Sequence, residues 1–155
     1  MEEQRIPNYW VLKTTDRSTG YDYWPVFVAE GVIAIGWDKI ERGENAVHAE
    51  NMIKKFKEID VGDRVLICKG YSPNQLKDVY IYGFAEVTGA FYDVKAPNGW
   101  GFRHPANIYC FVERYERVNL LRTTLNKKSM LYTLHKICNK EGFQQLESQL
   151  CKHQR

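Results

Sequence analysis

The sequence predicts an α+β fold in which a curved or closed β-sheet is covered by helices. Three observations predict it. Short apolar segments typical of buried strands alternate with amphipathic segments typical of helices, one long segment alternates strictly with small residues on one side, and no linker or repeat divides the 155 residues. A chain of this length buries about two-thirds of its unfolded surface around one core. We therefore expect a single domain over residues 1–155.

The N-terminal part alternates strands with helices. Residues 8–14 and 32–36 are apolar enough to be buried strands. Residues 24–30 predict a short helix that ends at Gly31, because glycine readily adopts the left-handed conformation that ends helices. Residues 46–56 have the spacing of an amphipathic helix. Its apolar positions share roughly one side: Val47, Met52, Ile53 and Phe56.

The middle of the chain predicts the centre of the sheet. The tripeptide 61–63 forms a turn into residues 64–70, a strand that is apolar on both faces and therefore central. Residues 78–91 alternate, and residues 108–112 predict another buried strand. One face of the alternating segment carries small residues, which favours a tightly curved sheet. That face consists of Val79, Ile81, Gly83, Ala85 and Val87.

Residues 121–155 predict a C-terminal helical extension. Ser129 is a suitable N-cap for a helix through Leu131, Leu134 and Ile137. Gly142 interrupts this helix before a last amphipathic stretch, whose apolar residues are Phe143, Leu146 and Leu150.

The cysteines and the N-terminus predict a cytoplasmic protein. Cys68, Cys110, Cys138 and Cys151 form no Cys-x-x-Cys pair or regular framework, and the first two lie in strand patterns as small hydrophobic residues. The sequence contains no signal-like apolar region and no run of about 18 apolar residues. The histidines lack the spacing of metal ligands, and we expect neither a metal nor a cofactor.

Two tryptophans next to glycines are candidates for binding a flat ligand. Trp37 follows Gly36 at the end of a predicted strand, and Trp100 lies between Gly99 and Gly101 in an irregular stretch. Asp38 could accept a hydrogen bond from an amino or imino N–H beside such a ligand. The alternative is that these tryptophans only pack in the core, as expected of Trp10.

Positive charge is concentrated in the second half of the chain. Residues 1–63 carry 8 Lys/Arg against 12 Asp/Glu, a net charge of −4, and residues 64–155 carry 14 against 7, a net charge of +7. The densest part runs from Arg114 to Lys140 and includes Lys127 and Lys128. Such a segment is either a phosphate-binding surface or an ordinary solvated face.

The order and spacing of these segments resemble the EVE and YTH branch of the PUA-like superfamily. The matching motifs are Asn-Tyr-Trp-Val-Leu-Lys-Thr at 8–14, Val-Gly-Asp-Arg-Val at 61–65 and Ile-Tyr-Gly-Phe-Ala-Glu-Val at 81–87. The resemblance spans residues 8 to about 120. It departs at residues 36–38, Gly-Trp-Asp, where EVE proteins usually carry Val-x-Asn, so the preferred base does not carry over.

The resemblance implies a PUA-like barrel that binds nucleic acid and holds one flipped, modified base in an aromatic cage. YTH domains read methylated adenine in RNA, and EVE-like modules stand at the front of restriction proteins that read modified DNA. We therefore expect a reader of methylated adenine or cytosine in DNA or RNA, with a nuclease or NTPase as downstream effector and no membrane partner. The base-binding candidates are Trp37, Trp100, Asp38, Lys13, Thr14, Tyr71 and Ser72. The phosphate-binding candidates are Arg103, His104, Lys127 and Lys128.

Two other functions stay open at this point. The related ASCH branch includes small hydrolases that use a lysine with nearby acidic residues, and Lys13, Asp38 and Glu86 would be that set here. A plain RNA-binding PUA-like domain would instead keep Trp37 in its core. The sequence is poor in nucleophiles and acid–base pairs, so a non-enzymatic reader is the main prediction.

Overall fold

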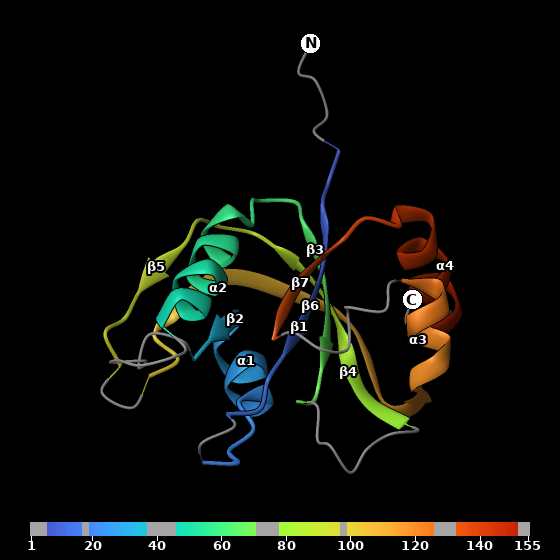
Figure 1. Ribbon diagram of the computed structural model, residues 1–155, viewed down its shortest axis with the longest axis horizontal. Helices are drawn as coiled ribbons and strands as arrows, with labels where there is room; N and C mark the ends of the chain where they lie inside the picture. Colours follow the sequence, from blue (N-terminus) through green and yellow to red (C-terminus); the bar gives the residue numbers. More distant parts are fainter. Residues whose placement is uncertain are drawn as a thin grey trace.

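The computed structural model describes residues 6–16, 19–36, 46–70, 78–96, 99–125 and 133–151, with only the backbone described at 46–49. Figure 1 shows its elements. They follow in the order β1 (Tyr9–Lys13), α1 (Trp24–Glu30), β2 (Val32–Ile35), α2 (Ala46–Glu58), β3 (Arg64–Cys68), β4 (Asp78–Val87), β5 (Tyr92–Asp93), β6 (Phe102–Arg117), α3 (Val118–Thr124), β7 (Leu134–Ile137) and α4 (Lys140–Leu150).

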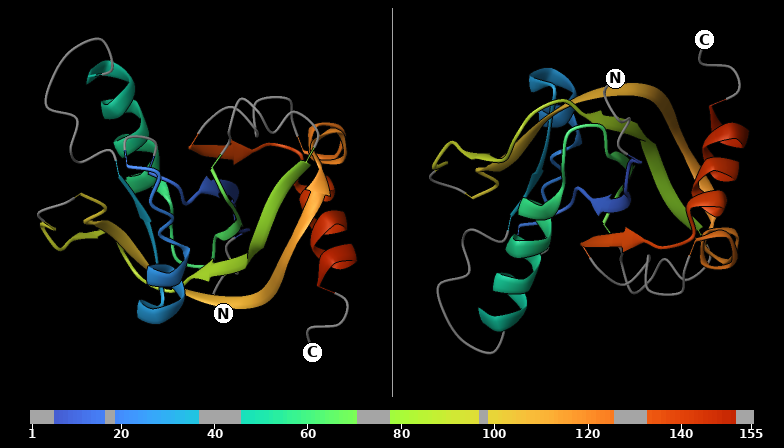
Figure 2. Two further views of the ribbon diagram at one scale, coloured as in Figure 1. Left: turned by 90° about the horizontal axis from the view of Figure 1, so that it is seen from below. Right: turned by 90° about the horizontal axis from the view of Figure 1, so that it is seen from above.

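Within the described residues, the strands form one curled sheet in the order β2-β6-β4-β3-β1-β7, with β5 added to β6. β1 and β3 are parallel, and the other neighbours are antiparallel. The parallel pair requires a long crossover, which α1, β2 and α2 supply. Figure 2 shows β4 and β6 bending strongly, with α2 toward one end of the curl and α3 and α4 at the other. The predicted α+β fold on a curved sheet is confirmed.

Alternation along β1 divides the hydrophobic core into two clusters. Trp10 and Leu12 pack with α1, β2 and α2, whereas Tyr9 and Val11 pack with α3 and α4. We call these clusters the α1–α2 core and the α3–α4 core. Members of the α1–α2 core include Trp10, Leu12, Phe27, Ile33, Met52 and Phe56. Members of the α3–α4 core include Tyr9, Val11, Leu66, Leu121, Phe143 and Leu146.

β4 does not keep the strict alternation that the sequence predicts over residues 79–87. Val79 and Ile81 lie in the α3–α4 core, but Ala85 and Val87 lie in the α1–α2 core. The reason is that β4 carries one extra residue against β3: Gly83 pairs with Ile67 and Ile81 pairs with Cys68, so Tyr82 has no partner of its own on β3. Because side chains alternate with a period of two, this single extra residue switches the face that the following residues occupy.

The Val-Gly-Asp turn before β3 fixes the start of β1. Asp63 is fully buried, and its carboxylate accepts hydrogen bonds from the backbone N–H of Asn8 (3.0 Å), the indole N–H of Trp10 (3.1 Å) and the backbone N–H of Asp60 (2.9 Å). A buried carboxylate is tolerated only with such partners. The aspartate of this motif therefore holds the two parallel strands together and does not face a ligand.

The predicted helix through Leu131, Leu134 and Ile137 is wrong in its described part. Leu134–Ile137 form strand β7, antiparallel to β1, and among the residues that the structure describes after Thr124, only those of α4 are helical. Leu134 and Ile137 point into different cores, which suits a strand that is buried at both ends. The proposed N-cap Ser129 and Leu131 lie outside the described residues.

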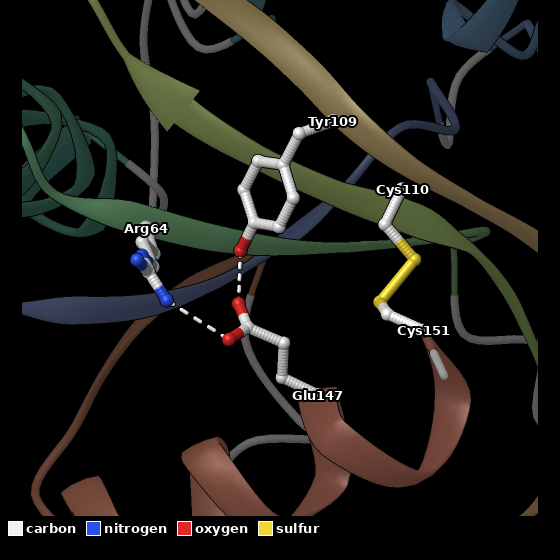
Figure 3. The surroundings of a disulfide bond; sticks show 5 residues. All are labelled: Arg64, Tyr109, Cys110, Glu147 and Cys151. Carbon is white, nitrogen blue, oxygen red and sulfur yellow. Dashed lines mark hydrogen bonds and ion pairs between the residues drawn. A yellow bond between two sulfur atoms is a disulfide. The ribbon is translucent and has the colours of Figure 1, made fainter. Parts of the chain in front are cut away.

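A disulfide fastens α4 to the sheet, as Figure 3 shows. Cys110 of β6 pairs with Cys151 at the end of α4, and their Cα atoms are 5.9 Å apart. The prediction that Cys110 is an unpaired hydrophobic residue is therefore wrong. A separation of 41 residues in sequence gave no sign that the two are neighbours in space. Cys68 and Cys138 are free thiols.

Polar contacts support the same attachment. Glu147 of α4 forms an ion pair with Arg64 of β3 at 2.9 Å and accepts a hydrogen bond from the Tyr109 hydroxyl (Figure 3). Burial and this hydrogen bond raise the pKa of Tyr109. α4 is thus held by apolar packing, charge and a covalent bond. In the part of the chain that the structure describes, no helix has the length and apolar character needed to span a bilayer.

Candidate nucleic-acid interface

Asp22 organises the region where β1 ends. The Thr14 hydroxyl donates to Asp22 Oδ1 at 2.6 Å, and the backbone N–H of Trp24 donates to the same oxygen at 3.0 Å. The Tyr82 hydroxyl donates to the other carboxylate oxygen. One carboxylate therefore joins the end of β1, the start of α1 and the middle of β4.

Trp100 is fixed in an unusual backbone conformation beside this region. Its φ of 62° lies in the left-handed region, which bulky residues rarely adopt. Its indole N–H donates to Asp16 Oδ2 at 3.1 Å, and its ring stacks on Tyr23 with centroids 4.3 Å and planes 12° apart. Trp100 is only 3 % exposed. Strain of this kind is concentrated at ligand-binding sites, but Tyr23 leaves at most one ring face for a ligand.

Gly36 brings the chain past the Trp100 ring. A Cβ atom at Gly36 would lie 2.3 Å from Trp100 Nε1 and 2.5 Å from Cε2, so no larger residue fits without moving the indole. Gly36 is also the last described residue before Trp37. The structure therefore places Trp100 against the residue that precedes Trp37, which is a necessary condition for a cage that contains both.

The structure places Arg103, a predicted phosphate contact, in a hydrogen bond and an ion pair within the protein. Its Nε–H donates to the Trp100 carbonyl at 3.2 Å, and its Nη1 forms an ion pair with Glu30 Oε2 at 2.8 Å. The Arg103 side chain is 13 % exposed. These bonds fasten the Trp100 loop to the end of α1, so Arg103 stabilises the strained Trp100 backbone.

His104 is also placed differently from the prediction. It is 1 % exposed, and its two ring nitrogens lie 2.7 Å from the Phe56 carbonyl and 3.2 Å from the Gly89 carbonyl. Its ring packs edge to face against Phe56. His104 therefore joins the end of α2 to the loop after β4 and presents no ring nitrogen to a phosphate.

Lys13 and Thr14 lie on opposite faces of the sheet. Lys13 follows Tyr9 and Val11 in the alternation toward the α3–α4 core and pairs in register with Cys68, whereas Thr14 points to Asp22. Burial lowers the pKa of Lys13, and the nearby Cys68 opposes this effect. Burial raises the pKa of Cys68 to about 11, so its thiol stays protonated near neutral pH and is a poor nucleophile.

The structure separates two of the three residues that the hydrolase hypothesis requires. Lys13 lies opposite Cys68 at one end of β3, and Glu86 lies opposite Arg64 at the other end. These positions are four residue steps apart along β3, which corresponds to about 13 Å. Lys13 and Glu86 are therefore too far apart for direct acid–base cooperation. The third member, Asp38, lies outside the described residues.

Six of the predicted functional residues lie outside the described residues and keep their status as predictions. They are Trp37, Asp38, Tyr71, Ser72, Lys127 and Lys128.

Sequence reasoning missed Asp16, Asp22 and Tyr23, which hold Trp100 and Thr14 in place. Asp22 had a weak signal, since it stands two residues before the helix start at Trp24-Pro25, where a carboxylate often accepts a backbone N–H. Asp16 and Tyr23 had none, because their contacts depend on a residue more than 75 positions away.

A curled sheet with helices packed around it and a parallel β1–β3 pair defines this chain as an α+β protein with the PUA-like fold. Several solved structures share it over almost their whole length. A hypothetical protein from Leishmania major has a TM-score of 0.60 and 13 % identity, covering 97 % of this chain and 98 % of that one.

Two similar structures contain nucleic acid. The Mmi1 YTH domain in complex with RNA has a TM-score of 0.58 and 7 % identity, covering 93 % of this chain and 77 % of that one. Human THYN1 in complex with DNA containing 5-methylcytosine has a TM-score of 0.50 and 11 % identity, covering 92 % and 96 %. No protein-family model and no curated protein matches the sequence, so the likeness is one of fold.

Proposed function

We propose that this protein is a non-enzymatic reader of modified nucleic acid that holds one flipped, methylated adenine or cytosine beside Trp100. The observation that carries the proposal is the strained, fixed Trp100 against Gly36, immediately before Trp37. The fold supports it, because it is shared with proteins whose structures contain RNA and methylated DNA.

The proposed cage stacks the base on Trp37, with Trp100 as its second aromatic wall. Flipping a base costs a few kcal/mol, and stacking returns about 1–3 kcal/mol per base, so two walls can offset the cost. Burying one methyl group adds only about 0.8 kcal/mol. Selectivity therefore depends on hydrogen bonds to the base edge, which we assign to Asp38, Tyr71 and Ser72.

The described residues set limits on this cage. The Thr14 hydroxyl proton is committed to Asp22, so Thr14 Oγ1 can only accept a hydrogen bond from a base. Lys13 faces the other core, and we leave it out of the residues that touch the base. Arg103 acts from behind the cage by holding the Trp100 carbonyl.

Tryptophan fluorescence tests the proposal. Titration with a methylated oligonucleotide is expected to quench the emission, because a base stacked on an indole provides a quenching path, and the matched unmodified strand is expected to quench much less. The quench should be smaller in a Trp37→Phe variant. Equal responses to both strands would contradict a modified-base reader.

Gly36→Ala is expected to weaken binding of the methylated oligonucleotide by about tenfold or more, since the new Cβ forces the Trp100 indole to move. The measurement is fluorescence polarisation, with the shift of tryptophan emission reporting the moved ring. Val28→Ala, at an exposed position of α1, is the control. Wild-type affinity in a Gly36→Ala variant with shifted emission would show that the position of Trp100 does not matter for binding.

Replacing Lys127 and Lys128 together by alanine is expected to weaken binding to all sequences alike. The slope of log affinity against log salt should fall by about one unit for each phosphate that the variant no longer neutralises. Titrations at several salt concentrations measure this slope. An unchanged slope would assign both lysines to solvated surface.

A further inference from the structure

A row of aromatic side chains runs from the start of α1 onto the neighbouring strands β4 and β6. Trp24 stacks on Tyr82 with centroids 4.8 Å and planes 11° apart. Tyr80 meets Tyr82 at 5.1 Å and Tyr115 at 4.9 Å, both edge to face, and Phe111 meets Trp24 at 5.9 Å. We call these five residues the aromatic row. Figure 2 shows α1 close to the curving ribbons of β4 and β6.

The row is open to solvent at both of its ends. Tyr115 is 57 % exposed and Phe111 is 38 % exposed, whereas Trp24 is buried. Tyr80 and Tyr82 are half-buried. Large exposed aromatic rings joined through a continuous series of ring contacts are unusual on a surface that binds nothing. The exposed rings are therefore available for stacking by a planar ligand.

A strained bulge fixes the rings in this arrangement. The register of β6 against β4 shifts opposite Tyr82, and Glu113 in the bulge has a φ of 49°, in the left-handed region. The Glu113 carbonyl accepts from the Tyr80 hydroxyl at 2.8 Å, and its carboxylate accepts from the Trp24 indole N–H at 3.3 Å. Bulges of this kind often re-aim side chains next to functional sites.

The aromatic row is continuous with the proposed base site. Its inner members Trp24 and Tyr82 both donate to Asp22, which also binds the Thr14 hydroxyl. Tyr23, which stacks on Trp100, directly precedes Trp24, so the row begins next to a residue that contacts Trp100.

Cationic residues border the row. Lys69 lies beside Tyr80, since its backbone N–H donates to the Tyr80 carbonyl at 2.9 Å. Arg117 follows Tyr115 by two residues on β6, which places it on the same face, and it is exposed. Such residues suit a phosphate backbone that passes the exposed rings.

We propose that the aromatic row stacks the unpaired nucleotides that flank the recognised base, and that the ligand is therefore a single strand. This inference rests on the proposed function. In a duplex, each base presents its faces to its neighbours, and only unpaired bases can stack on protein rings. The ring faces carry no sequence information, so the row adds affinity for any single strand and leaves the preference for the modification to the cage.

The test compares oligonucleotide lengths by fluorescence polarisation. Labelled oligouridylate and oligothymidylate of about three and about nine nucleotides, and a duplex of the longer length, are titrated with the full chain. The variants are Tyr115→Ala, Phe111→Ala and the double variant. Tyr115→Phe retains the ring, and Val61→Ala, at an exposed turn before β3, is the control for a surface change elsewhere.

We expect the double variant to bind the longer single strands about tenfold more weakly, with little change for the short ones or the duplex. Tyr115→Phe and Val61→Ala should bind as the wild type does. Unchanged affinity for the longer single strand, or an equal reduction for duplex and single strand, would overturn the proposal. Unchanged affinity together with weaker self-association in sedimentation would assign the row to a second copy of the chain.

A second pair of ligands separates this proposal from the proposed function. The longer strands are also prepared with one methylated base, and the ratio of modified to unmodified affinity is measured in each variant. A ratio near one in the wild type, with weaker binding in the double variant, would contradict the modified-base reader and support the stacking role of the aromatic row. A high ratio in the wild type, with unchanged binding in the double variant, would support the modified-base reader and contradict the stacking role.

Discussion

Replacing Trp37 by alanine is expected to lower the affinity for a methylated oligonucleotide by about 10- to 100-fold, which corresponds to about 1.4–2.8 kcal/mol. The reason is that the flipped base loses one of its two proposed stacking walls. Affinity for the unmodified strand should fall much less, because phosphate contacts and the aromatic row remain. Fluorescence polarisation with matched strands measures both values.

Two variants make this prediction specific. Trp37→Phe keeps a planar ring and should retain most of the preference for the modification. The thermal midpoint of Trp37→Ala, followed by circular dichroism, should stay close to that of the wild type. A folded Trp37→Ala variant with unchanged preference for the methylated strand would contradict the cage.

Breaking the disulfide is expected to lower the free energy of unfolding by about 2–4 kcal/mol. The Cys110–Cys151 bond closes a loop with a sequence separation of 41, so its removal gives the unfolded chain more conformational freedom. For a domain of this size, the midpoint should fall by about 5–15 °C. Thermal melts of Cys151→Ser against wild type, and of wild type with and without reductant, measure the change.

The matched control is Cys138→Ser, because Cys138 is an exposed free thiol. It should melt as the wild type does. We expect nucleic-acid affinity to survive in Cys151→Ser, since α4 packs in the α3–α4 core while Trp100 and Thr14 face the other side of the sheet. Equal midpoints for oxidised and reduced protein would show that apolar packing and the Glu147 contacts alone hold α4.

Local sequence signals predicted the elements that depend on local physics. The helix α1 begins and ends where expected, because Pro25 lies in its first turn and Gly31 adopts the left-handed cap with a φ of 64°. The strand after the Val-Gly-Asp turn was equally clear, since its run is apolar on both faces. The order of these elements was enough to predict a curved α+β fold.

Features that depend on distant partners were not predictable. Leu134 and Ile137 fit a helix by spacing, but β1 presented an open edge and the segment paired with it as β7. The extra residue of β4 against β3 and the two register shifts of its pairing with β6 depend on the partner strands, and no pattern within β4 signals them. The disulfide has the same origin, because only the folded sheet brings Cys110 near α4.

In the candidate site, too, some features follow from the local sequence and others depend on distant residues. The glycine-flanked Trp100 was noticed from its neighbours alone, and the structure adds why it is held: Asp16, Tyr23 and Arg103 all contact it. Lys13 was grouped with Thr14 because the family resemblance implies that both line the pocket. Strand alternation places them on two faces, as expected for adjacent residues of a strand.

The most direct test of the modified-base reader is a binding panel. Single- and double-stranded DNA and RNA oligonucleotides, each unmodified or carrying methylated adenine or methylated or hydroxymethylated cytosine, are titrated with the full chain by fluorescence polarisation. We expect about a tenfold or larger preference for one modified single strand over its unmodified match. Uniform binding of modified and unmodified strands, or no binding to any of them, would contradict the account.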